Sequence, residues 1–597
     1  MAEFDILITD GMIFDGRRSP RFRADVGIRD GFIAKIGKLD GAGAKRIIDA
    51  AGCNVAPGII DLHTHYDSQV FWDPYCSPSG WHGVTSVVIG NCGFGFAPVR
   101  PEERERAMLA MTRNEAVPLA CMQQGMPWDW VTFPEFLASL GRNPKSINVL
   151  PLVPLNPLMA WVMGTERGKA GVMPTDEEHA EMGRLINEAM DAGAGGISAQ
   201  RLGLASPQRD YDGKPMITDL MHDETMLYLA KVLAKRGAGV IQYSHTDFSA
   251  MISGDVETQK KVKRHIQEVA RISGRPILVA GAGDTDRQFI AESREMGLRI
   301  YGVYSTSGID GMEFTLCIGE SPGSFDSAGD AWSYATTGSK EEVKAKLADT
   351  KVRDTLRAAL PTMQKMFGQL SGWVLLQSAT PDMEKYEQSP LGHVAKSLNI
   401  DDLVDAFCEI NIREDLMTRW HGTLIRPSTL PDQQGDGTVW SADAQAVVAQ
   451  GQSSFKKIAE DPYGCPCISD GGAHTKFMTS GHFGIYFLIH YVREHRWLSL
   501  EEAHWKLSGL PALYAGFADR GTLVEGAPAD LFIYDFATLG ITDFEEVHDY
   551  PGNEWRRIDR PIGLHYVMVN GEVTMDHDVQ TNIPAGKLLR HGRAAAA

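Results

Sequence analysis

The most informative stretch of this chain is Pro57-Gly58-Ile59-Ile60-Asp61-Leu62-His63-Thr64-His65. It is an apolar segment that follows a Pro-Gly pair and ends in two histidines. Successive side chains of a strand alternate between its two faces, so His63 and His65 point the same way. Two imidazoles on one face, beside an aspartate, make half of a metal site. The stretch therefore predicts a metal centre at the C-terminal end of a buried β-strand.

Composition narrows the class of protein. The chain has 597 residues, of which 43% are hydrophobic and 23% charged, as in ordinary globular proteins. A formal charge of −19 argues against nucleic acids and anionic membranes as main partners. No apolar run approaches the roughly 20 residues that cross a bilayer, and the start of the chain lacks the pattern of a signal peptide. Eight scattered cysteines do not resemble a disulfide framework, so we expect a cytoplasmic protein.

The two ends of the chain carry a common pattern of short apolar runs around turn pairs. Such alternation is typical of β-hairpins. The turn pairs are Asp10-Gly11 and Asp30-Gly31 near the N-terminus and Asn570-Gly571 near the C-terminus. We predict that residues 1–56 and 516–597 pair into one small composite β-sandwich domain, which makes the middle of the chain an insertion.

Residues 57–515 alternate between strand and helix patterns. Apolar strand runs at 86–90, 196–198, 239–243 and 276–279 are separated by helices with capping boxes. The capping boxes begin at Thr175, Ser339 and Ser499. Such alternation predicts parallel strands with helical crossovers, and a (β/α)8 TIM-like barrel fits best. The extra length is expected in loops around residues 305–455, where Gly, Ser, Pro and Gln cluster.

Three further residues follow strand runs, where the active sites of such barrels form. Cys92 stands between glycines in Gly90-Asn91-Cys92-Gly93; beside the paired histidines we interpret it as a metal thiolate rather than a packed residue. His245 ends the run 240–245 and adds a third imidazole, with a loop histidine as the alternative interpretation. Asp470, in Ser469-Asp470-Gly471-Gly472, could cap a turn; opposite a metal it can ligate the ion and carry a proton.

Together these motifs resemble the amidohydrolase superfamily, and within it the N-acyl-D-amino-acid deacylase (D-aminoacylase) branch. The resemblance covers nearly the whole chain. It rests on the split β-domain and on four motifs: PGIIDLHTH (57–65), GNCG (90–93), SDGGAH (469–474) and RGTLVEGAPADLFIYD (520–535).

By position, the resemblance implies five metal ligands and one catalytic residue. The ligands are His63, His65, Cys92, His245 and Asp470, and Asp470 is also the catalytic aspartate. Tyr304 falls where the family has a substrate-contacting tyrosine. His474 ends the last site motif and is expected to contact substrate or the groups around the metal.

The sixth strand departs from the family pattern. The family ends this strand with a Ser-His pair and a nearby lysine, but residues 276–283 contain neither histidine nor lysine. One metal ligand is therefore missing. Either Asp284 replaces it, or the metal lies closer to His63, His65 and Asp470. The family's lysine helps to hold a substrate carboxylate, and the region 195–200 offers no lysine to bridge two ions. The absence of this lysine leaves room for a substrate other than a plain acyl amino acid.

We predict a hydrolase that cleaves a C–N bond, an amide of an N-acyl amino acid or a related compound, through a water activated by one or two zinc ions or another divalent metal. A cyclic amide or imide hydrolase is the first alternative. A metal-free binding or assembly protein with the same fold is the second. Small-molecule amides are the expected partners, and a homo-oligomer is expected only by analogy with the fold.

Overall fold

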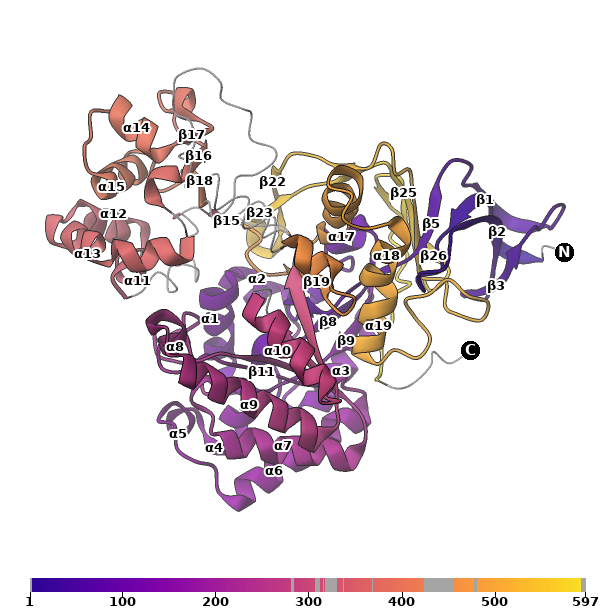
Figure 1. The fold of residues 1–597 in the computed structure, drawn as a ribbon, viewed down its shortest axis with the longest axis horizontal. Coiled ribbons are helices and arrows are strands. Elements are labelled where there is room, and N and C mark those ends of the chain that lie inside the picture. The colour runs from indigo at the N-terminus through magenta and orange to yellow at the C-terminus, as the bar shows by residue number, and fades with distance from the viewer. Residues whose placement is uncertain are drawn as a thin grey trace.

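The structure of the protein is a computed structural model. It describes residues 3–280, 284–306, 312–314, 316, 330–336, 338–367, 369–422, 455–476 and 480–591. Three parts can be followed in Figure 1: a β-domain beside both chain ends, a barrel in the centre, and a helical unit to one side. No helix of the described ranges combines the length and the apolar character that a membrane span requires.

The strands of the two chain ends form one nine-stranded sheet. β5 joins the two contributions, because its Pro57 pairs antiparallel with Leu531 of β20. The sheet runs β27-β26-β25-β20-β5-β1-β2-β3, with β4 paired to β1. Its strands are β1 (Phe4–Ile13), β2 (Phe22–Arg29), β3 (Phe32–Gly37), β4 (Ala44–Asp49), β5 (Asn54–Pro57), β20 (Leu531–Tyr534), β25 (Leu564–Val569), β26 (Glu572–Asp576) and β27 (Val579–Gln580). The composite β-domain is thus present, as one continuous sheet.

Two of the three predicted hairpin turns are found. Asp30-Gly31 joins β2 to β3, and Asn570-Gly571 joins β25 to β26, with positive φ at both positions of each turn. The prediction for Asp10-Gly11 is wrong, because β1 continues through this pair with a shift of register. A Cβ on Gly11 would lie 2.5 Å from Cγ2 of Val55. The glycine therefore allows close packing of strands rather than a turn.

The middle of the chain closes a parallel barrel, which confirms the predicted fold class. Around the ring, β7 pairs with β19, and the pairing continues through β14, β13, β12, β11 and β10; β6, β8 and β9 complete it. Only Leu62 separates β6 from β7 and only Leu152 separates β9 from β10, so each pair acts as one strand and the described ring has eight positions. The strands are β6 (Ile59–Asp61), β7 (His63–Thr64), β8 (Val84–Ile89), β9 (Asn148–Pro151), β10 (Val153–Pro154), β11 (Gly196–Arg201), β12 (Val240–His245), β13 (Ile277–Ala280), β14 (Ile300–Ser305) and β19 (Cys465–Gly471).

Helices pack around this ring. Their starts follow the predicted capping boxes: Oγ1 of Thr175 accepts the amide of Glu178 at 3.2 Å, and Ser339 and Ser499 cap their helices in the same way. The helices are α1 (Arg104–Glu115), α2 (Leu119–Gly125), α3 (Phe133–Arg142), α4 (Leu155–Met163), α5 (Thr165–Lys169), α6 (Asp176–Ala192), α7 (Asp223–Arg236), α8 (Phe248–Ser253), α9 (Val256–Ser273), α10 (Asp284–Glu295), α17 (Phe483–Phe487), α18 (Leu500–His504) and α19 (Leu510–Ala515).

Between β14 and β19, where we expected loops, the described residues form a helical unit with a hydrophobic core of its own. Trp332, Trp373, Phe407 and Trp420 are fully buried in that core. Large aromatic side chains provide enough apolar area to stabilise such a unit apart from the barrel. The unit contains α11 (Asp330–Thr336), α12 (Lys340–Ala348), α13 (Thr350–Phe367), α14 (Leu391–Ser397), α15 (Leu403–Arg413), β15 (Met312–Phe314), β16 (Val374–Gln377), β17 (Ser389–Pro390) and β18 (Arg419–Gly422). The domain boundaries given above stay predictions.

Candidate metal centre

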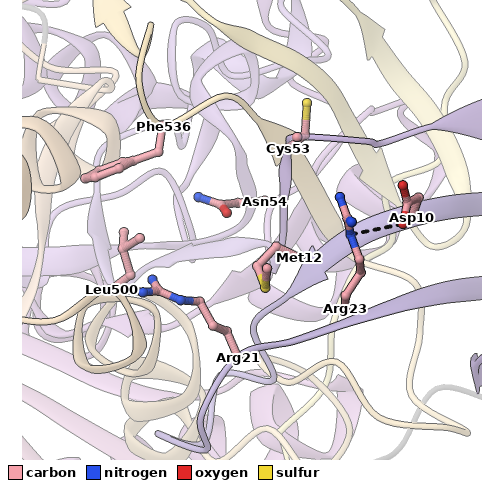
Figure 2. A pocket seen from close by; sticks show the side chains of 9 residues that line it. Asp10, Met12, Arg21, Arg23, Cys53, Asn54, Leu500 and Phe536 are labelled. Atoms are coloured by element: carbon pink, nitrogen blue, oxygen red, sulfur yellow. Dashed lines mark ion pairs between the residues drawn. The ribbon is translucent and has the colours of Figure 1, made fainter.

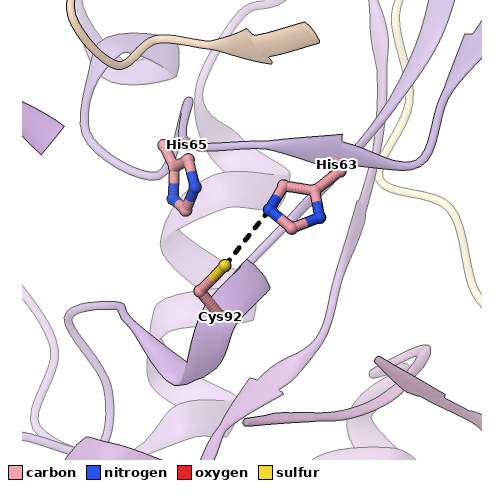
Figure 3. A group of neighbouring side chains, drawn as sticks. All are labelled: His63, His65 and Cys92. Carbon is pink, nitrogen blue, oxygen red and sulfur yellow. Dashed lines mark hydrogen bonds between the residues drawn. The ribbon is translucent and has the colours of Figure 1, made fainter. Parts of the chain in front are cut away.

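Two histidines of the first barrel strand form the base of the site. His63 and His65 are buried, with 4% and 2% of their surface exposed. The amide of His63 donates to Oδ1 of Asp61 at 3.2 Å, and the amide of His65 donates to the carbonyl of Gly471 at 2.7 Å. These bonds fix the end of the strand, so both rings face the same space, as Figure 3 shows.

Cys92 comes to this space from the turn that follows β8. Its Sγ lies 3.2 Å from Nε2 of His63. The turn has Cys92 at a φ of 55°, a left-handed conformation that is costly for a cysteine. Neighbours hold it there: the amide of Cys92 donates to Oε1 of Gln242 at 2.8 Å, and Asn91 donates its side-chain amide to the carbonyl of Thr64 at 3.2 Å.

Asp470 enters from β19 on the opposite side. Its Oδ1 lies 3.5 Å from Nε2 of His63 and 3.6 Å from Nε2 of His65. Asp470 also has a left-handed backbone, with a φ of 52°. The glycines that follow it let this turn approach β7: a Cβ on Gly472 would lie 2.7 Å from the carbonyl carbon and oxygen of His65. The Asp-Gly-Gly sequence therefore sets the separation between the aspartate and the histidines.

The donor atoms of His63, His65 and Cys92 suit a metal ion, and Asp470 lies beside both histidines. In a tetrahedral site with bonds of about 2.0–2.3 Å, neighbouring ligand atoms are roughly 3.3–3.7 Å apart. The separations of 3.2, 3.5 and 3.6 Å around His63 and His65 agree with this geometry. Burial lowers the pKa of His63 and brings that of His65 to about 3, so both rings are neutral and can bind a metal through Nε2. The ligand atoms of His63, His65 and Cys92 all lie within 4.8 Å of one another.

A buried glutamate beside this group was missed by the sequence analysis. Glu115, the last residue of α1, is 1% exposed, and its Oε2 lies 3.7 Å from Nε2 of His65. Burial, with the nearby charges of Asp470 and Asp67, raises the pKa of Glu115 well above its ordinary value. Nε2 of His474 is 3.6 Å from the same oxygen, and its amide donates to the carbonyl of Glu115 at 2.7 Å. The predicted site residue His474 thus adjoins the metal-binding group through Glu115.

His245 is not brought to this group, contrary to our expectation. It lies instead among Asp223 and His265, which the surrounding helices provide. There its ring lies 5.5 Å from that of His265, and its Nδ1 contacts the carbonyl of Arg201 at 3.0 Å. These neighbours separate His245 from the group around His63.

A second group of possible metal ligands surrounds that histidine. It consists of Asp223, His245 and His265. The guanidinium of Arg201 lies among them, because it pairs with the carboxylate of Asp223 and has Nη1 3.4 Å from Nε2 of His245. A positive charge thus already neutralises this aspartate, which makes the group a poor place for a cation.

Tyr304 also lies away from the site. Val303 packs in the barrel interior, so its neighbour Tyr304 faces outward, where a cavity is lined by Asp461 and Tyr463. Burial raises the pKa of Tyr304 well above 10. Among the described residues, no hydrogen bond joins Tyr304 to the metal-binding group, and its contact with substrate stays a prediction. For Asp284, the other candidate ligand, only the backbone at the start of α10 is described.

The cavity in Figure 2 belongs to the β-domain and not to this site. It has a volume of about 290 Å³ and is lined by residues of β1, β2 and β5 together with Leu500 and Phe536. The ion pair between Arg23 and Asp10, at 3.0 Å, crosses one side of it. None of the metal-binding group lines this cavity, so we assign no chemistry to it.

A family model and several known proteins are similar to this chain. A model described as an amidohydrolase family matches residues 46–214. A D-aminoacylase from Alcaligenes xylosoxydans xylosoxydans is 26% identical over 593 residues, which cover 98% of this chain and 97% of that protein. An uncharacterized protein of Mycobacterium tuberculosis is 37% identical over 202 residues. That match covers 33% of this chain, which spans only 32% of the length of that relative.

Solved structures share the fold over almost the whole chain. An N-acyl-D-glutamate deacylase from Bordetella bronchiseptica, solved with zinc and a phosphonate inhibitor, has a TM-score of 0.61 and 23% identity, and the match covers 98% of this chain and 99% of that one. A D-aminoacylase has a TM-score of 0.62 and 20% identity, with coverage of 98% and 100%. These comparisons confirm the fold class and the resemblance predicted from the sequence.

Proposed function

We propose, from a resemblance to the amidohydrolase superfamily and its D-aminoacylase-like branch that extends over 98% of this chain, that the protein hydrolyses the amide bond of an N-acyl amino acid. One observation carries the proposal. Donor atoms of His63, His65, Cys92 and Asp470 converge at the C-terminal ends of barrel strands, where enzymes of this fold have their active sites. The comparisons named above support this class of substrate.

These four residues would hold a divalent metal, and we propose zinc because it accepts both imidazole and thiolate ligands. A zinc ion in such a site lowers the pKa of a bound water to about 7 and polarises a carbonyl oxygen. The residues suit this ion: both histidines are neutral, and the thiolate of Cys92 would offset part of the metal's charge. Asp61, which accepts the backbone amide of His63, would hold the end of this strand in place.

Asp470 is the member of the group that a substrate can reach. Its side chain is 35% exposed, against 6% for His63 and 2% for His65. We assign to it the transfer of one proton. The carboxylate accepts the proton of the attacking water as the water oxygen bonds to the acyl carbon, and it returns that proton to the nitrogen as the C–N bond breaks. The products are a carboxylic acid and a free amine, so the step is balanced.

A substrate panel tests this function. The zinc-supplemented protein is incubated with N-acetyl derivatives of acidic and apolar amino acids in both D and L forms, and the released amine is quantified. We expect release from at least one open-chain N-acyl amino acid, and a loss of about 10²–10⁴-fold in Asp470→Asn. Ring opening of hydantoins or imides, without release from open-chain compounds, would instead establish a cyclic amidase. No turnover of either class by zinc-loaded protein would contradict the proposal.

The panel includes both enantiomers because the stereochemical preference is part of what we propose. The relatives that match over long stretches include a D-aminoacylase and an N-acyl-D-glutamate deacylase, the latter 34% identical over 239 residues. We therefore propose N-acyl-D-amino acids as substrates, in the cytoplasm. Equal rates on the L-enantiomers would refute this finer assignment and leave amide hydrolysis intact.

A further inference from the structure

We propose that one β-hairpin of the C-terminal segment positions both metal-bearing loops of the barrel, and that Tyr550 and Glu554 are its positioning residues. This inference rests on the proposed function, because it concerns the same active site. The hairpin consists of β22 (Glu545–Tyr550) and β23 (Glu554–Ile558). Among the described strands these two pair only with each other, and Figure 1 shows them apart from the nine-stranded sheet. The sequence motifs described above do not include this hairpin.

Tyr550 and Glu554 project from one face of the hairpin. They are partners in its ladder, and directly opposed residues of an antiparallel pair have their side chains on the same side. Tyr550 is buried and the side chain of Glu554 is 29% exposed, so the rest of the protein largely covers this face. The loop that follows β7 and the turn that follows β19 provide the contacts of the two side chains.

Tyr550 contacts the loop that follows His65. Its hydroxyl donates to Oε1 of Gln69 at 2.6 Å, and Gln69 is a buried residue four positions after His65. The side-chain amide of Gln69 donates in turn to Oδ2 of Asp73 at 2.9 Å. Nη1 of Arg556, from β23, lies 3.5 Å from that same oxygen. The hairpin therefore holds this loop at two points.

Glu554 contacts the turn that carries Asp470. Its Oε2 lies 2.7 Å from Nζ of Lys476, whose side chain is 8% exposed. The backbone amide of Arg557, in the same strand, donates to the carbonyl of Thr475 at 2.8 Å. Both bonds reach the chain within six residues of Asp470. One hairpin thus binds the loops on both sides of the metal-binding group.

The turn after β19 needs such restraint. Asp470 and His474 have left-handed φ angles of 52° and 53°. These conformations are costly for residues other than glycine and persist only where surrounding contacts hold them. The pair of Glu554 with Lys476 supplies one such contact directly after the strained residues, and its loss leaves a buried ammonium without this carboxylate. A displacement of about 1 Å in an active site lowers turnover about 10²-fold.

Two variants with matched controls test the inference. Tyr550→Phe and Glu554→Gln each remove one contact of the hairpin. Tyr514→Phe removes a hydrogen bond of the same length, 2.6 Å, from another buried tyrosine. Glu502→Gln removes an ion pair of 2.6 Å with Arg18, and the side chain of Glu502 is 25% exposed. Neither control residue belongs to the hairpin or to the metal-bearing loops.

Each protein is analysed for kcat and KM of amine release and, with cobalt(II) in place of zinc, for its visible absorption spectrum. We expect kcat to fall about 10–100-fold in both hairpin variants with KM unchanged, because the restraint acts on Asp470 rather than on substrate binding. The cobalt bands report the geometry of the metal's ligands, so they should shift in both hairpin variants. In both controls, kcat and the bands should match those of the wild type.

Contrary results overturn the inference in distinguishable ways. Wild-type kcat and spectra in the two hairpin variants refute the positioning role, and equal losses in the controls show that the hairpin contributes stability alone. Should Glu554→Gln fail to fold, Tyr550→Phe, which removes a single oxygen, decides the matter. If the wild type releases no amine, the proposed function fails, while the cobalt spectra still test the hairpin. A wild type that binds no cobalt contradicts both.

Discussion

Alanine at Gly472 is expected to separate Asp470 from the two histidines. Gly472 has a φ of +91°, and a Cβ there would lie 2.7 Å from the carbonyl carbon and oxygen of His65. The contact must open by about 0.7 Å to reach 3.4 Å, the beginning of ordinary van der Waals contact. Because both neighbours are backbone atoms, the turn that carries Asp470 has to move.

The magnitude follows from two costs. A left-handed alanine costs about 1–2 kcal/mol, and overpacking in a tight region adds about 1–3 kcal/mol. A displacement of about 1 Å in an active site reduces turnover about 10²-fold. Gly526 provides a matched control, because its φ is +89° but no atom lies within 4 Å of its Cβ position. Gly526→Ala should therefore lose stability only through its left-handed backbone, without overpacking, and should keep its activity.

The assay is amine release from an accepted N-acyl amino acid, with zinc content measured on the same samples. We expect Gly472→Ala to lose about 10²-fold in kcat, with Gly526→Ala within a factor of two of the wild type. Equal activities of the two variants would refute the view that this glycine sets the separation of Asp470 from His65.

Three further predictions concern residues around the barrel. Gln242→Leu removes the acceptor for the amide of Cys92 and should weaken zinc binding about 10–100-fold in competition with a chelator. Asp530→Asn removes the buried carboxylate that pairs with the guanidinium of Arg520, leaving only that of Asp519 at 3.6 Å, and should lower the free energy of unfolding by about 3–5 kcal/mol in urea denaturation. Burial lowers the pKa of Lys506 to about 8, below its value in the unfolded chain. The unfolded state then binds more protons between about pH 8 and 10.5, so stability should rise with pH there, and less so in Lys506→Met.

For each of these three predictions, a specific result would contradict it. Wild-type zinc affinity in Gln242→Leu would mean that the turn of Cys92 is held without this bond. A loss under about 1 kcal/mol in Asp530→Asn would mean that Oδ1 of Asn570, which accepts from the guanidinium of Arg520, and the carboxylate of Asp519 suffice to compensate its charge. Parallel pH profiles for Lys506→Met and the wild type would show that this amine does not titrate differently on folding.

Much of the fold could be predicted because the sequence patterns that specify it are local. Asp30-Gly31 and Asn570-Gly571 were identified as turns because both pairs tolerate positive φ, which hairpins need. Asp10-Gly11 has the same sequence as Asp30-Gly31, but its glycine allows close packing of strands. That role depends on Val55, which is distant in sequence. The hydrophobic core between β14 and β19 was missed for a related reason: its buried tryptophans are far apart along the chain.

The sequence predicted those residues of the candidate site that directly follow strands. His63, His65, Cys92 and Asp470 come together at adjacent strand ends. His245 also ends a strand, yet it lies with Asp223 and His265, and its position at a strand end did not distinguish it from the residues of the site. Glu115 ends a helix with no motif around it, so only the packing of α1 against the turn of His474 reveals it.

Anomalous diffraction from zinc-loaded crystals would show whether His63, His65 and Cys92 hold a catalytic metal. We expect an anomalous peak at the zinc edge about 2.0–2.3 Å from both histidine nitrogens and from the sulfur of Cys92. Absence of a peak there, or a peak only among Asp223, His245 and His265, would contradict it.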